Sequence, residues 1–163
     1  MTIIIDAGVF FAYFDKKDNH HFDSAALLYH CLEGRFGTSF TTDYVVLETT
    51  LLIQRKLGED VCLSFLDFLR DGGLRTIAMG EEHYEHSVET FRQNFPRFSL
   101  CDSATIVLMN SFGIQNLASY DERSFEGLAQ DIRGKNYYEA LSKPDQATIK
   151  RKILGRQRQE THV

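Results

Sequence analysis

Short β-branched runs alternate with longer segments of helical periodicity along the chain. The run TIII at 2–5 is typical of a buried parallel strand. Further strands are predicted at 36–40, 74–79 and 114–120. Helices are predicted at 22–34, 43–58, 60–73, 81–94 and 99–113, with a short turn or helix at 121–127 and a last polar helix from Pro144. Strands separated by helices predict right-handed βαβ units and hence an α/β fold, with a mostly parallel sheet covered on both faces.

The composition is that of an ordinary globular protein of one domain. The chain has 163 residues, of which 25% are charged and 43% hydrophobic. No apolar stretch approaches the roughly 20 residues of a membrane span, and no basic leader precedes the first strand. Three separated cysteines, Cys31, Cys62 and Cys101, form no metal-binding or disulfide pattern. These features predict a cytoplasmic protein with reduced cysteines and no membrane contact.

Charge is distributed unevenly along the chain. From residue 141 onward there are six Lys or Arg against two Asp or Glu, a balance of +4; the first 140 residues carry 12 against 21, a balance of −9. We therefore expect a compact domain over 1–141 and a basic helical extension of it over 142–163. The extension is either a solvated helical tail or a basic arm that faces a partner.

Four carboxylates are predicted to lie near one edge of the sheet. Asp6 follows the first strand directly and Asp121 follows the fourth, while Glu48 and Asp102 lie early in two helices. Ligands of open α/β sheets bind outside the carboxyl ends of the strands. Clustered carboxylates raise each other's pKa unless cations neutralise them, and Mg²⁺ or Mn²⁺ prefers such oxygen ligands. Two such ions about 4 Å apart promote in-line hydrolysis of a phosphodiester, so the cluster indicates a nuclease.

Each carboxylate also has a purely structural interpretation, although Asp6 is hardest to explain in that way. Asp102 completes a capping box with Ser99, Asp121 is a turn former, and Glu48 is placed on a solvated helix face. Asp6 follows three isoleucines, where burial of a charge is costly without a partner. The order and placement of the four together favour a metal site.

The chain resembles PIN-domain proteins, most closely the VapC-type toxin ribonucleases and their archaeal relatives. The resemblance runs from Thr2 to about Phe125, through the stretches IIIDAGVFFAYFDKKDNHH, TSFTTDYVVLETTLLIQRKLG, FSLCDSATIVLMNSFGI and NLASYDERSF. It implies a three-layer α/β/α fold, and it places the acidic residues of the family on Asp6, Glu48, Asp102 and Asp121. It also implies RNA cleavage that depends on Mg²⁺ or Mn²⁺, frequent homodimers and, for toxin members, a small antitoxin protein.

One position departs from the family pattern. The residue after the first Asp is usually Ser or Thr, whose hydroxyl helps to hold the carboxylate or a metal-bound water; here it is Ala7. Either a neighbouring hydroxyl or a water replaces it, or the enzyme is slow. Ala7 therefore favours an alternative function, a non-catalytic or weakly active PIN scaffold that binds RNA or protein.

Four other residues are secondary candidates. Thr42 and Ser119 flank the carboxylates and are candidates for hydrogen bonds that support them, with a helix cap and a plain strand residue as the alternatives. Arg97 and Arg123 lie close in sequence to Asp102 and Asp121 and are candidates for RNA phosphate contacts, or are plain surface residues. RNA approaches an acidic groove only if positive charge lies somewhere nearby.

Overall fold

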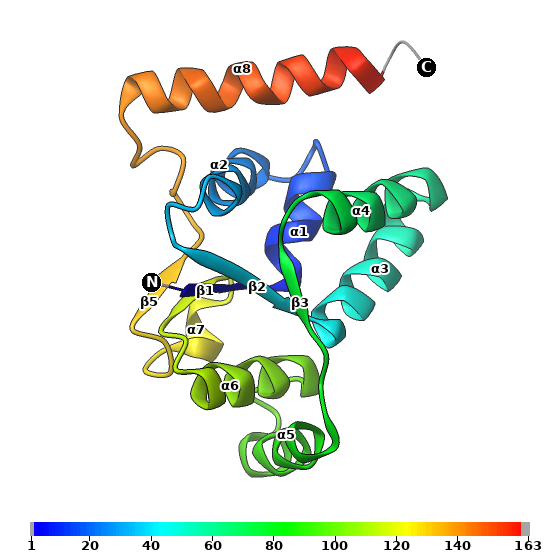
Figure 1. Ribbon diagram of the computed structural model, residues 1–163, viewed down its shortest axis with the longest axis vertical. Coiled ribbons are helices and arrows are strands. Elements are labelled where there is room, and N and C mark those ends of the chain that lie inside the picture. Colours follow the sequence, from blue (N-terminus) through cyan, green and yellow to red (C-terminus); the bar gives the residue numbers. More distant parts are fainter. Residues whose placement is uncertain (1, 161–163) are drawn as a thin grey trace.

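Five strands form one sheet with helices on both faces, as Figure 1 shows for the computed structural model. The structure describes residues 2–160, and side chains up to residue 153. The strands are β1 (Thr2–Ile5), β2 (Thr38–Thr42), β3 (Arg75–Ile77), β4 (Asn116–Ala118) and β5 (Asp131–Arg133). All their pairings are parallel, in the order β3-β2-β1-β4-β5. The predicted α/β fold with a parallel sheet is therefore confirmed.

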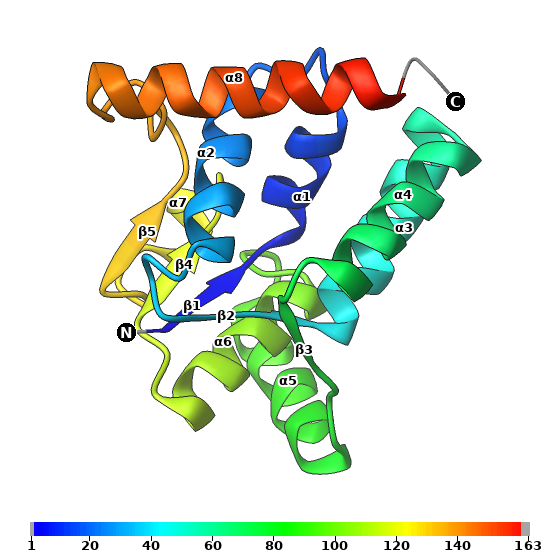
Figure 2. The same ribbon diagram turned by 45° about the horizontal axis from the view of Figure 1, so that its top comes forward.

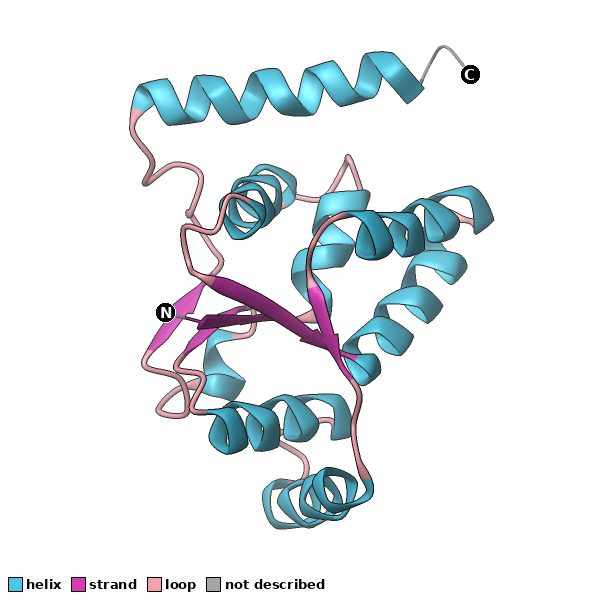
Figure 3. Cartoon of the chain, in the orientation of Figure 1, coloured by secondary structure: helices cyan, strands magenta, loops and turns pink. Residues whose placement is uncertain are grey.

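The helices separate into two layers about this sheet (Figure 3). The first four, α1 (Ala7–Phe14), α2 (His21–Leu32), α3 (Asp43–Leu57) and α4 (Glu59–Asp71), cover one face. The other face carries α5 (Glu81–Asn94), α6 (Leu100–Phe112) and the short α7 (Glu122–Phe125). The predicted three-layer α/β/α arrangement is present.

The first strand supplies the core on both faces because successive strand residues point in opposite directions. Ile3 and Ile5 are fully buried among side chains of α1 to α4. Ile4, between them, is fully buried against α6, β4 and α7. A run of isoleucines without polar alternation is thus the expected sequence of a central strand buried on both sides.

The strand order places a topological switch point between β1 and β4. The chain leaves β1 for β2 and β3 on one side, then returns to lay β4 and β5 on the other side of β1. The register pairs Ile5 with Ala118, so these two strands end together. A crevice outside the carboxyl ends of the strands at such a point is the usual ligand site of an open α/β sheet.

A long last helix, α8 (Lys143–Glu160), lies across the outside of α2 in both views of the ribbon (Figures 1 and 2). Ile149 anchors it in a small apolar cluster with Ala25 and Ala26 of α2. The predicted extension over 142–163 is helical as far as residue 160, and 161–163 lie outside the described residues. Within residues 2–160, no helix combines the length and the apolar character needed to cross a bilayer.

Candidate metal centre at the switch point

Asp6 and Ser119 meet at the switch point. Asp6 follows β1 and Ser119 follows β4, and the backbone N–H of Asp6 donates to the carbonyl of Ala118 at 3.0 Å. The buried Ser119 hydroxyl donates to Asp6 Oδ2 at 2.8 Å, and the N–H of Ala7 donates to Oδ1 at 2.8 Å. Asp6 therefore begins α1 as its N-cap, with its carboxylate fixed from two sides.

The surroundings of Asp6 are unfavourable for a lone negative charge. Burial raises its pKa from 3.8 to about 6, although the hydrogen bonds from Ser119 and Ala7 act in the opposite direction. Asp102 and Glu48 also raise this pKa, because their negative charges act on the same carboxyl group. The structure thus brings three of the predicted carboxylates into one electrostatic neighbourhood.

Glu48 and Asp102 reach this neighbourhood from α3 and α6. Glu48 is exposed in the second turn of α3, whereas Asp102 is half-buried in the first turn of α6. Asp102 also forms a complete capping box: its Oδ2 accepts the N–H of Ser99 at 2.8 Å, and Ser99 Oγ accepts the N–H of Asp102 at 3.0 Å. The structural interpretation of Asp102 is therefore correct, and it coexists with the electrostatic contact to Asp6.

Asp121 is exposed and is connected to Asp6 through Ser119. Its backbone N–H donates to Ser119 Oγ at 3.1 Å, so one hydroxyl bridges the two segments. Its side chain caps α7: Oδ1 accepts the N–H of Ser124 at 3.1 Å, and Oδ2 accepts the Ser124 hydroxyl at 2.6 Å. In this arrangement the Asp121 carboxylate is the N-cap of α7.

The other candidates take up different positions. Thr42 is fully buried and its hydroxyl accepts the N–H of Val45 at 3.0 Å, so it caps α3. Arg97 donates to the carbonyls of Ser124 and Glu126 at 2.8 and 3.2 Å, which ties the loop before α6 to α7. Arg123 is exposed on α7.

Sequence reasoning missed one close neighbour of the cluster. Cys101 is half-buried; burial raises the pKa of its thiol, and a hydrogen bond with Glu48 raises it further. The thiol is therefore protonated and lies beside the carboxylates. Its place directly before Asp102 was the available signal.

The donor set suits a hard divalent cation. All four side chains offer oxygen, and the charges that act most strongly on Asp6 are both negative. Among the side chains that the structure describes, up to residue 153, however, no three Asp, Glu, His or Cys residues stand close enough together to hold a metal ion as they lie. Asp102 and Asp121 bond to Ser99 and Ser124 instead. The donors therefore fit a divalent ion in their chemistry, while in this structure the carboxylates of Asp102 and Asp121 act as helix caps.

Comparison with known proteins agrees with this architecture. The chain is 32% identical over 153 residues to a VapC ribonuclease of Archaeoglobus fulgidus, covering 91% of this chain and 93% of the relative. It is 25% identical to ribonuclease VapC26 of Mycobacterium tuberculosis, covering 77% and 91%. The crystal structure of M. tuberculosis VapC20, described as a sarcin-ricin loop cleaving toxin, shares the fold with a TM-score of 0.66 at 19% identity, covering 75% of this chain and 92% of that one. Models of known protein families give no match. The extent of the first of these similarities shows that the chain belongs to the VapC ribonuclease family.

Proposed function

We propose that this protein is a metal-dependent endoribonuclease and the toxin of a toxin–antitoxin pair. The observation that carries the proposal is the carboxyl group of Asp6, which lies at the switch point with two like charges acting on it and a pKa raised to about 6. Two curated relatives are named as ribonucleases, and a solved neighbour as an RNA-cleaving toxin. Their names support RNA as the substrate of this chain.

The carboxylates of Asp6, Glu48, Asp102 and Asp121 would hold Mg²⁺ or Mn²⁺. A bound divalent ion supplies Lewis acidity for the phosphodiester and stabilises the charge that develops on the leaving oxygen. It also neutralises the cluster, which would otherwise repel an RNA strand. The N–H of Ala7 and the hydroxyl of Ser119 orient Asp6 throughout, since each donates to a different carboxylate oxygen.

The hydroxyl absent at Ala7 has a counterpart in Ser119. Ala7 is 6% exposed and its methyl group packs in the core, so it offers no hydrogen bond from its side chain. Ser119 is fully buried, and its hydroxyl reaches the same carboxylate from the neighbouring strand. We infer that Ser119 performs the orienting function that Ser or Thr performs at the position of Ala7 in other members. This favours the enzyme over the non-catalytic scaffold.

Positive charge for the RNA backbone would come from Arg123 and Arg97. Arg123 is exposed two residues after Asp121. Arg97 is exposed as well, although its guanidinium lies over the ring of Phe98 at 4.9 Å and binds backbone carbonyls of the α7 region. Arginine forms strong paired hydrogen bonds with phosphate. Arg123, whose side chain carries no such bonds in the structure, is the better candidate for the phosphate contact.

Protein partners would cover the exposed side of α3. Leu47 and Leu51 lie one turn apart and are 60% and 53% exposed, on either side of Glu48 in the sequence. Exposed apolar side chains beside a functional residue are typical of an interface. An antitoxin segment or a second copy of the chain that packs there would also restrict access to Glu48. Light scattering of the purified protein, with Leu51→Glu as the variant, tests the homodimer.

The decisive experiment is cleavage of a structured RNA by the wild type, Asp6→Asn and Asp102→Asn with Mn²⁺ or Mg²⁺. Asp67→Asn is the matched control, because Asp67 is an exposed carboxylate that pairs with Arg70 on α4. We expect cleavage by the wild type and the control, loss in both site variants, and loss with a chelator. Cleavage that survives both site substitutions would refute the proposal. Metal binding without any cleavage would support the scaffold instead.

A further inference from the structure

Three consecutive residues, Ser119, Tyr120 and Asp121, connect β4 to α7 and are called the catalytic turn below. Ser119 donates to Asp6, and Asp121 donates its N–H to Ser119. The position of the turn therefore sets how well the Ser119 hydroxyl meets the carboxylate. The side chain of Tyr120 has no part in the metal centre itself and points to α2 instead, where its contacts explain what fixes the turn.

The phenol of Tyr120 is anchored on the N-terminal end of α2. Its hydroxyl shares a hydrogen bond of 2.6 Å with Ser24 Oγ, and it donates to the carbonyl of His20 at 3.2 Å. Ser24 is fully buried.

The ring of Tyr120 is also packed against neighbouring groups from three segments of the chain. The imidazole of His20 stacks on it with ring centroids 4.2 Å apart and an angle of 18° between the planes. A methyl group at Gly8 would lie 3.7 Å from the ring, so the start of α1 passes close to it. At Gly134, directly after β5, a Cβ atom would lie 2.1 Å from the carbonyl oxygen of Ser119 and 3.1 Å from the ring, so only glycine permits the chain to pass there.

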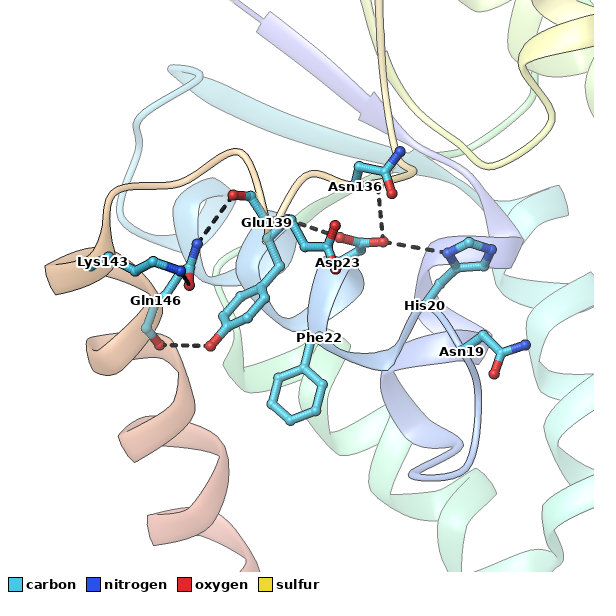
Figure 4. Close-up of a pocket in the computed structure, with 9 residues that line it drawn as sticks. Asn19, His20, Phe22, Asp23, Asn136, Glu139, Lys143 and Gln146 are labelled. Atoms are coloured by element: carbon cyan, nitrogen blue, oxygen red, sulfur yellow. Dashed lines mark hydrogen bonds and ion pairs between the residues drawn. The ribbon is translucent and has the colours of Figure 1, made fainter.

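His20 is itself fixed by Asp23, as Figure 4 shows. Its Nδ1 lies 3.4 Å from Asp23 Oδ2, and the same carboxylate accepts the backbone N–H groups of Asn136 and Tyr138. The stacking partner of Tyr120 therefore belongs to a rigid junction between α2 and the loop after β5.

We propose that Tyr120 is a positioning residue for the carboxylate centre: its ring and hydroxyl hold the catalytic turn against α2, so that the Ser119 hydroxyl stays on Asp6. The proposal rests on the proposed nuclease function for its effect on rate. Its structural part, the restraint of the turn, does not depend on that function. Small displacements of groups that orient a metal ligand commonly cost about ten- to a hundredfold in metal affinity or activity.

The test compares Tyr120→Phe with the matched variant Tyr138→Phe. Tyr138 also donates a phenolic hydrogen bond to a backbone carbonyl, that of Gln146 at 3.1 Å, but on the α8 side of the molecule. Three quantities are measured for each: amide hydrogen exchange of residues 119–121 without metal, the dissociation constant for Mn²⁺, and kcat and KM for a cleaved RNA. We expect Tyr120→Phe to speed exchange in the turn, to weaken Mn²⁺ binding about threefold or more, and to lower kcat about three- to tenfold with KM within twofold.

Ser24→Ala and the double variant sharpen the result. Tyr120→Phe removes the bonds to both Ser24 and the His20 carbonyl, whereas Ser24→Ala removes only the shared one, so Ser24→Ala should have the smaller effect. The double change should be little worse than Tyr120→Phe alone, because the shared bond is already lost there. Equal exchange in the turn and equal Mn²⁺ affinity for Tyr120→Phe and Tyr138→Phe would overturn the proposal. A wild type that cleaves no RNA would contradict the nuclease function alone, since the exchange measurement needs neither substrate nor metal.

Discussion

Two aspartates at the starts of neighbouring helices show how differently the molecule uses a carboxylate. Asp23, in the first turn of α2, accepts the N–H of Tyr138 at 2.8 Å and that of Asn136 at 3.2 Å, and it faces the His20 imidazole. Asp6, at the start of α1, accepts one N–H and one hydroxyl, and the charges that act most strongly on it belong to other carboxylates.

The difference separates a structural carboxylate from the one that we propose as functional. The Asp23 carboxylate contacts two backbone N–H donors and the imidazole of His20, which becomes a cation when protonated. Its charge therefore helps to join α2 to the loop after β5. Asp6 has donors too, yet burial and like charges raise its pKa to about 6. A site that gathers negative charge without neutralising it is poised to bind a cation, and perturbed groups of this kind concentrate at functional sites.

The largest expected effect is on catalysis. Asp6→Asn keeps one acceptor oxygen, replaces the other with an NH2 donor and removes the negative charge. We therefore expect RNA cleavage to fall more than about 100-fold, because a neutral amide is a poorer ligand for Mg²⁺ than a carboxylate. A discontinuous cleavage assay at saturating Mn²⁺ measures it. Asp23→Asn, the same chemical change at the other aspartate, should cost far less activity per folded molecule; equal losses would break the comparison.

Asp23→Ala, in contrast to Asp6→Asn, should lower the stability of the protein more than its activity. It leaves the N–H groups of Asn136 and Tyr138 without their acceptor in a partly buried junction. An unsatisfied group of this kind costs about 1–3 kcal/mol, so we expect the free energy of unfolding to fall by about 2–4 kcal/mol. Urea denaturation measures it, with Asp67→Ala on the surface as the control. A loss below that of the control would mean that the junction contributes little.

Stability without metal should depend on pH through Asp6. Its folded pKa of about 6 exceeds the unfolded value of 3.8, so the native state binds more protons between these values. Stability is then greatest below pH 3.8 as far as this group is concerned, and it falls as pH rises through 6. The free energy of unfolding of Asp6→Asn, relative to that of the wild type, should therefore rise by about 2 kcal/mol between pH 4 and pH 7. Urea denaturation with a chelator present measures it. A difference in unfolding free energy between the two proteins that stays constant from pH 4 to pH 7 would contradict this prediction.

The smallest expected effect concerns the donors around Asp6. Ser119→Ala removes the hydroxyl that lowers the pKa of Asp6, so the carboxyl group should become still harder to ionise. Mn²⁺ affinity should then fall about tenfold, as is usual when a group that orients a metal ligand is lost. Isothermal calorimetry measures it, with Ser64→Ala on the exposed face of α4 as the control. Unchanged affinity would show that Ser119 does not replace the hydroxyl absent at Ala7.

Much of the fold is predictable because its central elements have strong patterns. The isoleucines of β1 and the capped helices α3 and α6 lie within two residues of their predicted bounds. The second strand begins two residues later than expected, because Gly37 turns the chain with a φ of 71° before it. The sequence does not predict β5, since three residues with charged ends carry no apolar alternation. It sets no bounds for α1 either, because the segment AGVFFAYF has no charged residue to mark a solvent-facing side.

The candidate site was less accessible to sequence reasoning than the fold. Placement after β1 is enough to single out Asp6, and the three-residue spacing of Ser99 and Asp102 is enough to predict their capping box. The hydrogen bonds of Asp121 to Ser124, in contrast, depend on side-chain geometry that the sequence does not reveal. The role of Tyr120 was invisible for a related reason. Its partners Ser24 and His20 lie about 100 residues away in the sequence.

We infer that Asp6 carries a charge that the protein leaves for a divalent cation to neutralise. The most direct measurement is the titration of the Asp6 side-chain carboxyl carbon by NMR, first with a chelator and then with saturating Mg²⁺. We expect a midpoint near pH 6 without metal and a fall to below about pH 5 with Mg²⁺, because a bound cation favours the charged form. A midpoint that stays the same when Mg²⁺ is added would contradict it.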